Sequence, residues 1–188
     1  APAGATADLD GDGQLVLEAE TGHVLNSATH GWLAATAMAA YTGTAYVQAL
    51  PDVDALTPAE SLTDTARLAY PLYFAQAGSY TVWLRGYASN AAGDSATLSL
   101  GEQTLSLTGF APGAWEWHST TTQGHTAALT VTSAGLYTLT LAMREDGLRI
   151  DRLLLISDTT YLPTAQGPAG TETLTQPLRI ERQVERVI

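Results

Sequence analysis

Short runs in which apolar and polar residues alternate recur along the chain, and Gly, Asn or Pro separates them. In residues 67–74, Leu68, Tyr70, Leu72 and Phe74 fall on one side and polar or smaller residues on the other. Alternation with a period of two is typical of β-strands with one buried face. The pattern predicts strands over residues 14–20, 44–50, 67–74, 79–87, 95–100, 103–107, 114–121, 127–132, 136–143 and 148–157. So many short strands predict an all-β fold, a two-sheet antiparallel β-sandwich or jelly roll.

Two internal segments do not alternate. Residues 33–40 are rich in good helix formers, and this predicts a short helix or a compact loop. Residues 51–64 form an acidic loop, in which Thr57 as cap and Pro58 at the first helical position predict one helical turn.

The two ends predict the domain organisation. Residues 1–13 are rich in Gly, Ala and Asp and predict a linker or N-terminal arm before a single domain at 14–164. A Pro- and Gly-rich stretch predicts a second linker at 165–177. The β-branched content of residues 178–188 favours a strand over a helix. Such a strand needs a partner in its own domain, in a following domain or in another chain.

Composition narrows the possible functions. The chain is 45% apolar and 14% charged, as in globular proteins, and it lacks cysteine. Its net charge of -11, with arginine as the only strongly basic residue, argues against nucleic acid and anionic membranes as partners. No apolar run approaches the ~18 residues of a membrane-spanning helix. The Ala- and Gly-rich start is compatible with a removed signal peptide or with a cut in a longer protein, and we expect a secreted or cell-surface protein.

Three carboxylates stand among apolar strand residues. Glu18 and Glu20 share one strand face, and Asp151 lies on an apolar face of the last predicted strand. A buried carboxylate needs a cation or an arginine. The sequence therefore predicts a calcium site at these three residues, and it leaves open the alternative that they lie in water or pair with Arg149 or Arg152.

A second acidic cluster precedes the first predicted strand. Asp8, Asp10 and Asp12 resemble the start of a calcium-binding loop, but its twelfth position is Ala19 where the loop needs an acid. The pattern favours a solvated acidic linker and leaves open whether these residues bind a second calcium ion.

No motif indicates an enzyme. Glu145 and Asp146 are adjacent, whereas a glycosidase pair faces its substrate from different strands. Gly147 after Asp146 is typical of a hairpin turn. The four histidines, His23, His30, His118 and His125, lack the spacing of a metal site.

Aromatic residues offer another kind of site. Trp115 and Trp117 alternate onto one strand face, and Trp32, Tyr41 and Tyr46 lie in or before the second predicted strand. Exposed aromatic rings stack on the C–H faces of sugars, although the same residues can equally belong to a core.

Several segments, in order, resemble a known family: LVLEAE, GTAYVQALPD, AGSYTVWLRGYA, GAWEWHST, SAGLYTLTLAMREDGLRIDRLLLISD and YLPT. Together, residues 14–164 are similar to carbohydrate-binding modules of families 6 and 35, galactose-binding-like β-sandwiches of secreted bacterial multidomain or surface proteins. The resemblance implies a module without catalytic activity. It also implies a structural calcium ion held by Glu18, Glu20 and Asp151.

The resemblance further implies a glycan-binding site. Its contacts would be Trp115, Tyr46 or Tyr41, and Asp146 with Glu145. Many sugar-binding members carry Asn where this chain has the acidic pair.

Two functions follow from the sequence. The first is a calcium-stabilised extracellular module that binds a glycan or polysaccharide. The alternative is a structural subunit of a filament or surface adhesin, in which residues 178–188 add a strand to a neighbouring copy.

Overall fold

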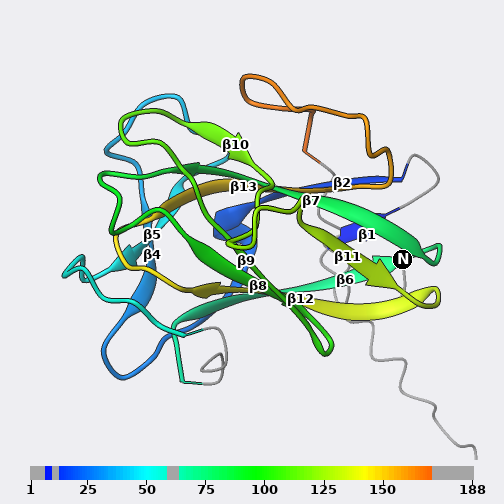
Figure 1. The fold of residues 1–188 in the computed structure, drawn as a ribbon, viewed down its shortest axis with the longest axis horizontal. Helices are drawn as coiled ribbons and strands as arrows, with labels where there is room; N and C mark the ends of the chain where they lie inside the picture. Colours follow the sequence, from blue (N-terminus) through cyan, green and yellow to red (C-terminus); the bar gives the residue numbers. More distant parts are fainter. Residues whose placement is uncertain (1–6, 10–12, 59–63, 171–188) are drawn as a thin grey trace, which may run out of the picture.

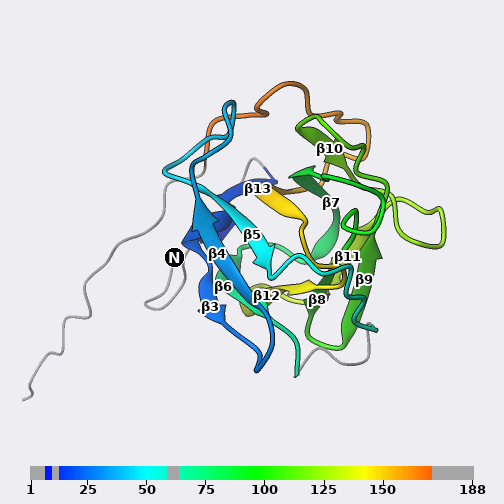
Figure 2. The same cartoon turned by 90° about the vertical axis from the view of Figure 1, so that its left-hand side faces the viewer.

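The computed structural model describes residues 7–9, 13–58 and 64–170. These residues form two β-sheets packed face to face (Figures 1 and 2). No helix in this part of the chain is long and apolar enough to cross a membrane. The prediction of an all-β, two-sheet sandwich is confirmed.

The first sheet has the strand order β1-β6-β12-β8-β9, and β3 also pairs with β6. β1 runs parallel to β6, and the remaining pairs of this sheet are antiparallel. Its strands are β1 (Ala7–Leu9), β3 (His23–Leu25), β6 (Arg67–Phe74), β8 (Ala96–Leu100), β9 (Gln103–Leu107) and β12 (Gly135–Met143).

The second sheet has the order β10-β7-β13-β5-β4, with β11 also on β7 and β2 also on β13, and all its pairs are antiparallel. Its strands are β2 (Gln14–Glu18), β4 (Gly31–Ala35), β5 (Tyr46–Leu50), β7 (Gly78–Tyr87), β10 (Glu116–His118), β11 (Ala128–Val131) and β13 (Arg149–Ile156).

Alternation along the strands builds the core between the sheets. In β6, the apolar positions Leu68, Tyr70, Leu72 and Phe74 are fully buried, as their spacing predicts. In β13, Leu153 and Leu155 also face this core, whereas Leu154 between them belongs to a separate cluster on the outer face of the second sheet. The second sheet therefore buries side chains on both of its faces.

Three short strands differ from the prediction. β4 occupies the start of the segment predicted as a helix or compact loop, because Trp32 enters the core and donates from Nε1 to the Ala66 carbonyl at 3.2 Å. β1 lies within the predicted N-terminal linker, and β3 was not predicted. The first predicted strand ends at Glu18, and Ala19–Thr21 form a 3-10 turn.

Residues 158–170, which we call the strap, run over the outer face of the second sheet (orange in Figures 1 and 2). The strap includes the described part of the predicted second linker. The predicted strand at 178–188 lies outside the described residues, as do Asp10, Asp12 and most of the helical turn predicted after Thr57. Strand addition through the tail therefore stays a prediction.

Candidate functional site

The register of the second sheet sets a row of side chains across its outer face. Leu33 of β4 pairs with Gln48 of β5, Gln48 with Arg149 of β13, and Arg149 with Tyr87 of β7. Trp115, just before β10, continues the row, with its ring centroid 5.7 Å from that of Tyr87. The sheet thus aligns apolar, polar and aromatic side chains on its outer face, where Gln48 is buried and Arg149, Tyr87 and Trp115 are partly exposed.

Four rings at this end form a continuous set, which we call the aromatic cluster: Tyr41, Tyr46, Trp115 and Tyr87. Successive ring centroids are 5.7, 5.4 and 5.7 Å apart, in edge-to-face contacts that favour fixed ring positions. Tyr46 is only 2% exposed, and its buried ring contacts the Tyr41 and Trp115 rings. The other three rings are partly exposed.

The cluster brings together three residues predicted from the sequence, Trp115, Tyr41 and Tyr46. Tyr87 was missed. The alternation of β7 places Tyr87 on the face opposite the core residues Val82 and Leu84, which was the available signal.

Two arginines flank the cluster. The guanidinium carbon of Arg85 lies 5.4 Å from the centre of the Trp115 ring, and that of Arg149 lies 5.5 Å from the centre of the Tyr87 ring. Arg149 donates to the Ser89 hydroxyl, and its buried Nε has no hydrogen-bond partner. Within the described part of the chain, Arg149 has no carboxylate at ion-pair distance, unlike Arg85.

Asp146 lies away from solvent. Its carboxylate is fully buried and accepts hydrogen bonds from the Val53 and Ala55 amides at 2.8 and 3.0 Å. His30 Nε2 lies 3.3 Å from the same carboxylate. Asp146 therefore fastens the loop after β5, and no described hydrogen bond or ring contact joins it to the aromatic cluster.

Glu145 faces a different neighbourhood. It accepts hydrogen bonds from the Ser95 hydroxyl at 2.6 Å and the Asp94 amide at 3.1 Å. These contacts tie the connection between β12 and β13 to the residues just before β8. The hairpin turn predicted at Asp146 and Gly147 is wrong, because β12 and β13 lie in different sheets and do not pair. A glycan contact for Glu145 or Asp146 stays a prediction.

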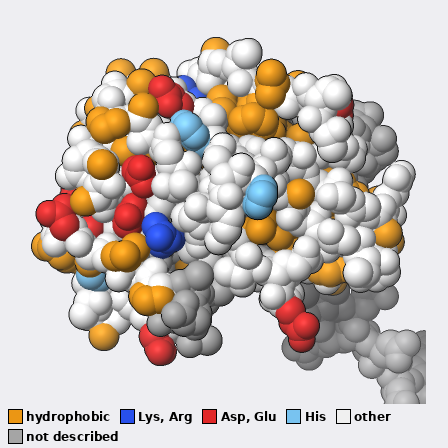
Figure 3. All heavy atoms as spheres, viewed as in Figure 1, with side chains coloured by type: hydrophobic (Ala, Val, Ile, Leu, Met, Phe, Trp, Pro, Cys, Tyr) orange, Lys and Arg blue, Asp and Glu red, His pale blue; other side chains and the backbone are white. Residues whose placement is uncertain are grey.

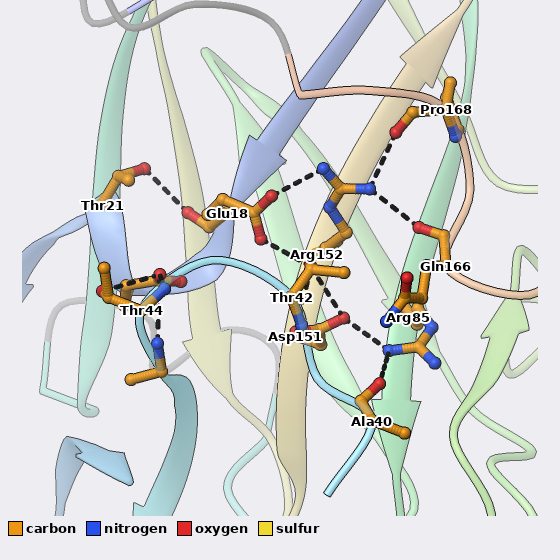
Figure 4. A network of polar contacts seen from close by, with 12 residues as sticks. Glu18, Thr21, Ala40, Thr42, Thr44, Arg85, Asp151, Arg152, Gln166 and Pro168 are labelled. Atoms are coloured by element: carbon orange, nitrogen blue, oxygen red, sulfur yellow. Dashed lines mark hydrogen bonds and ion pairs between the residues drawn. The ribbon is translucent and has the colours of Figure 1, made fainter. Parts of the chain in front are cut away.

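All three predicted calcium ligands contact the loop at residues 42–44. Figure 4 shows Glu18 and Asp151 beside Thr42 of this loop. Asp151 accepts from the Thr42 amide at 2.7 Å and from Arg85 Nη1 at 2.6 Å. Glu18 accepts from Arg152 Nη2 at 2.6 Å and from the Thr42 hydroxyl at 2.7 Å. Of the arginines that the sequence analysis left open as partners, Arg152 pairs with Glu18, whereas Asp151 pairs with Arg85, which was not predicted. Arginine pairing accounts for these two carboxylates without a cation.

Glu20 differs from the other two. Its Oε1 accepts from the Thr44 amide at 2.7 Å, whereas its buried Oε2 has no hydrogen-bond partner. A Cβ at Gly43 would lie 2.3 Å from Glu20 Oε1 and 3.0 Å from Glu18 Oε2, so the loop needs glycine to approach both carboxylates. Burial and then the charge of Glu20 raise the pKa of Tyr70, whose hydroxyl donates to the Ala19 carbonyl at 2.8 Å.

The contacts of Glu18, Glu20 and Asp151 support a bound cation only in part. The free oxygen of Glu20 and the close approach of Gly43 favour one. However, the described residues contain no group of three or more His, Cys, Asp or Glu side chains arranged to hold a metal ion. Calcium at Glu18, Glu20 and Asp151 stays a prediction.

No protein-family model matches the chain. The curated "uncharacterized protein P23" of Formosa agariphila is 24% identical over 151 residues, which cover 69% of this chain and 37% of the relative. The family 35 carbohydrate-binding module of Clostridium thermocellum superposes with a TM-score of 0.55 at 17% identity, covering 77% of this chain and 98% of the module. The chain has the fold of a family 35 carbohydrate-binding module.

Two other solved structures that contain this module are also similar to the chain. The Podospora anserina GH26-CBM35 β-(1,4)-mannanase gives a TM-score of 0.56 at 17% identity, over 81% of this chain and 29% of the enzyme. Xyl-CBM35, in complex with a disaccharide that contains glucuronic acid, gives 0.53 at 14% identity, over 77% of this chain and 94% of that one. The chain thus spans less than a third of the mannanase and most of the isolated module.

On this module fold, the strap covers the end of the outer face away from Tyr87. The Ala165 carbonyl accepts from Arg85 Nε at 3.0 Å and from Trp117 Nε1 at 3.1 Å. Arg152 Nη1 donates to two further strap carbonyls, those of Gln166 and Pro168, both at 2.8 Å. The apolar residues beneath are Val16, Leu154 and Ile156, with Trp83, Trp117 and Tyr161 packed against them.

Proposed function

We propose that this chain is a non-catalytic module that binds a glycan at the exposed faces of Trp115, Tyr87 and Tyr41. The observation that carries the proposal is the aromatic cluster, in which partly exposed rings are held in fixed positions on the outer face of a sheet. Aromatic faces stack on sugar C–H groups, and nearby polar groups bind the hydroxyls. Arg149, which is partly exposed, supplies such a group in the same row.

The structural neighbours support a glycan as the ligand. One of them is described in complex with a disaccharide that contains glucuronic acid. Arg149, which has no carboxylate partner among the described residues, offers a cation for an acidic sugar beside the Tyr87 ring.

The proposal extends to location and metal. Acidic side chains gather at one end of the face shown in Figure 3, in keeping with the net charge of -11 and with a partner that is neither nucleic acid nor an anionic membrane. We place the module outside the cell, where its glycans would be found. We also propose a structural calcium ion, for which the free buried oxygen of Glu20 is the support.

Affinity electrophoresis against a panel of neutral and uronic-acid-containing polysaccharides tests the proposal. We expect at least one polysaccharide to retard the wild type, and Trp115→Ala to remove that retardation. The control is Leu136→Ala, because Leu136 is 53% exposed on β12 in the opposite sheet, and it should bind as the wild type does. If no polysaccharide retards the wild type, or if both variants bind equally, the proposed site is wrong.

A further inference from the structure

Arg85 joins four parts of the molecule. It is 4% exposed on β7, and its Nη1 donates to the Ala40 carbonyl at 3.0 Å and to Asp151 at 2.6 Å. Its Nε donates to the Ala165 carbonyl of the strap at 3.0 Å. Its guanidinium also lies over the Trp115 ring. One side chain therefore contacts a loop, a strand, the strap and the proposed glycan site (Figure 4 shows all but Trp115 and Ala165).

Arg85 and the loop it binds also fix Trp115. Trp115 Nε1 donates to the Ala39 carbonyl at 3.0 Å, and the next carbonyl, of Ala40, is held by Arg85. The arginine thus holds both the ring, by a cation–π contact, and the loop segment to which the ring N–H is bonded. A planar guanidinium suits this role because its N–H groups have fixed directions.

The strap completes the set of bonds around Arg85. Without the Ala165 carbonyl, Arg85 Nε would lose its bond to the strap, and an unpaired polar group in a buried position is costly. The same carbonyl accepts from Trp117, and Gly167 packs against the Trp117 ring. The position of the strap is therefore linked to the orientation of Arg85.

We propose that the strap and Arg85 together position Trp115 for glycan binding: the strap holds Arg85, and Arg85 holds Trp115. Arg85 is a positioning residue, because it acts on the ligand through Trp115. The inference rests on the proposed function. It adds that the strap, which covers the other end of the outer face, affects the affinity of the aromatic cluster for the glycan.

A pair of glycine variants in the full chain tests the link. In Gly167→Ala, the new Cβ would lie 2.5 Å from the Trp117 ring at a φ of +77°, so the strap must move. In the control, Gly124→Ala, φ is +80° and no atom lies within 4 Å of the Cβ, so the backbone strain is matched without displacing a neighbour. Circular dichroism first verifies that both variants are folded at the assay temperature.

We expect Gly167→Ala to weaken glycan binding by about 2- to 30-fold, and Gly124→Ala to leave the Kd within about twofold of the wild type. Arg85→Lys, which keeps the charge but not the directed N–H groups, should weaken binding in the same way as Gly167→Ala. A Kd unchanged in both Gly167→Ala and Arg85→Lys would overturn the inference.

A second measurement reports on Trp115 whether or not a glycan is found. The four tryptophans are labelled with 5-fluorotryptophan, and their ¹⁹F resonances are assigned with single Trp→Phe variants. We expect Gly167→Ala to shift the resonances of both Trp117 and Trp115, and Arg85→Lys to shift that of Trp115. A shift confined to Trp117 would show that the strap does not reach Trp115. Absence of any wild-type binding would instead remove the proposed function, and the Trp115 resonance would then decide whether the strap sets its position.

Discussion

The outer face of the second sheet carries similar residues at its two ends but exposes them very differently. At the covered end, Val16 and Leu154 are 1% and 0% exposed beneath the strap. At the open end, Leu33 is 50% exposed and Tyr87 is partly exposed. Residue type alone does not separate the two ends.

Trp115 and Trp117 show what does separate them. They are two residues apart and on the same face, yet Trp117 donates to the Ala165 carbonyl of the strap, whereas Trp115 donates to the Ala39 carbonyl of a loop. The strap thus contacts the Trp117 ring, and no described hydrogen bond joins it to Trp115. Substitutions at matched positions on the two ends can test this division.

The largest expected effect is at the boundary between the ends. Asp151→Ala leaves Arg85 buried without its carboxylate, and loss of one partner of a buried ion pair costs about 3–5 kcal/mol. Urea unfolding measures this loss. The control is Glu116→Ala on β10, because Glu116 pairs with His118 at a more exposed position and should change stability by about 0.5 kcal/mol or less. Equal effects of the two variants would mean that Arg85 does not depend on Asp151.

The next largest effect comes from replacing a leucine by alanine at each end of the outer face. Leu154→Ala removes a fully buried side chain under the strap and should lower the free energy of unfolding by about 2–4 kcal/mol. Leu33→Ala, in the same sheet and on the same face, should change it by about 0.5 kcal/mol or less. A small effect of Leu154→Ala would show that the strap does not seal this end in solution.

The sequence was sufficient for the fold wherever strands alternate. β6 and β9 have the predicted bounds, since β6 alternates cleanly and Gly101 and neighbouring turn residues separate β8 from β9. The helix or compact loop predicted at residues 33–40 was wrong at its start, because β4 pairs along its length with β5 and Trp32 enters the core, although its Ala-rich composition favours a helix. Tertiary contacts of this kind leave no local pattern. Residues 36–40 belong to neither a strand nor a helix, as the loop alternative allows.

The candidate site was predictable in part. The sequence grouped Glu18, Glu20 and Asp151, and all three do contact one loop. The predicted shared strand face was wrong, because Glu20 lies in the 3-10 turn that follows β2. The arginine partners of Glu18 and Asp151 were harder to assign, because a bulge between Ile150 and Arg152 shifts the register that decides which arginine reaches Asp151. Residues 165–170 of the strap were predicted as part of a linker, since their hydrogen bonds use backbone carbonyls, which every residue has.

Calcium binding at the loop of residues 42–44 would stabilise the fold next to Asp151, at the boundary between the two ends. If Glu20 Oε2 binds calcium, a concentration of 100 times the Kd should stabilise the fold by about 2.7 kcal/mol, and EDTA should reverse this. Differential scanning calorimetry measures the change in Tm. Glu20→Gln should remove the calcium effect. The same Tm in calcium and in EDTA would show that Arg85 and Arg152 are sufficient for the carboxylates at this loop.

The smallest expected effect lies wholly at the open end. Tyr87→Ala removes the ring between Trp115 and Arg149, and an aromatic contact of this kind contributes about 1 kcal/mol, which corresponds to about a fivefold weaker Kd for the glycan. Isothermal titration calorimetry measures the Kd. Tyr87→Phe keeps the ring and should bind within about twofold of the wild type. Because the Tyr87 ring is not covered by the strap, Tyr87→Ala should leave the ¹⁹F resonance of Trp117 unchanged, in contrast to Gly167→Ala. A shifted Trp117 resonance in Tyr87→Ala would mean that the two ends are not separate and that the strap responds to the aromatic cluster as well as supporting it.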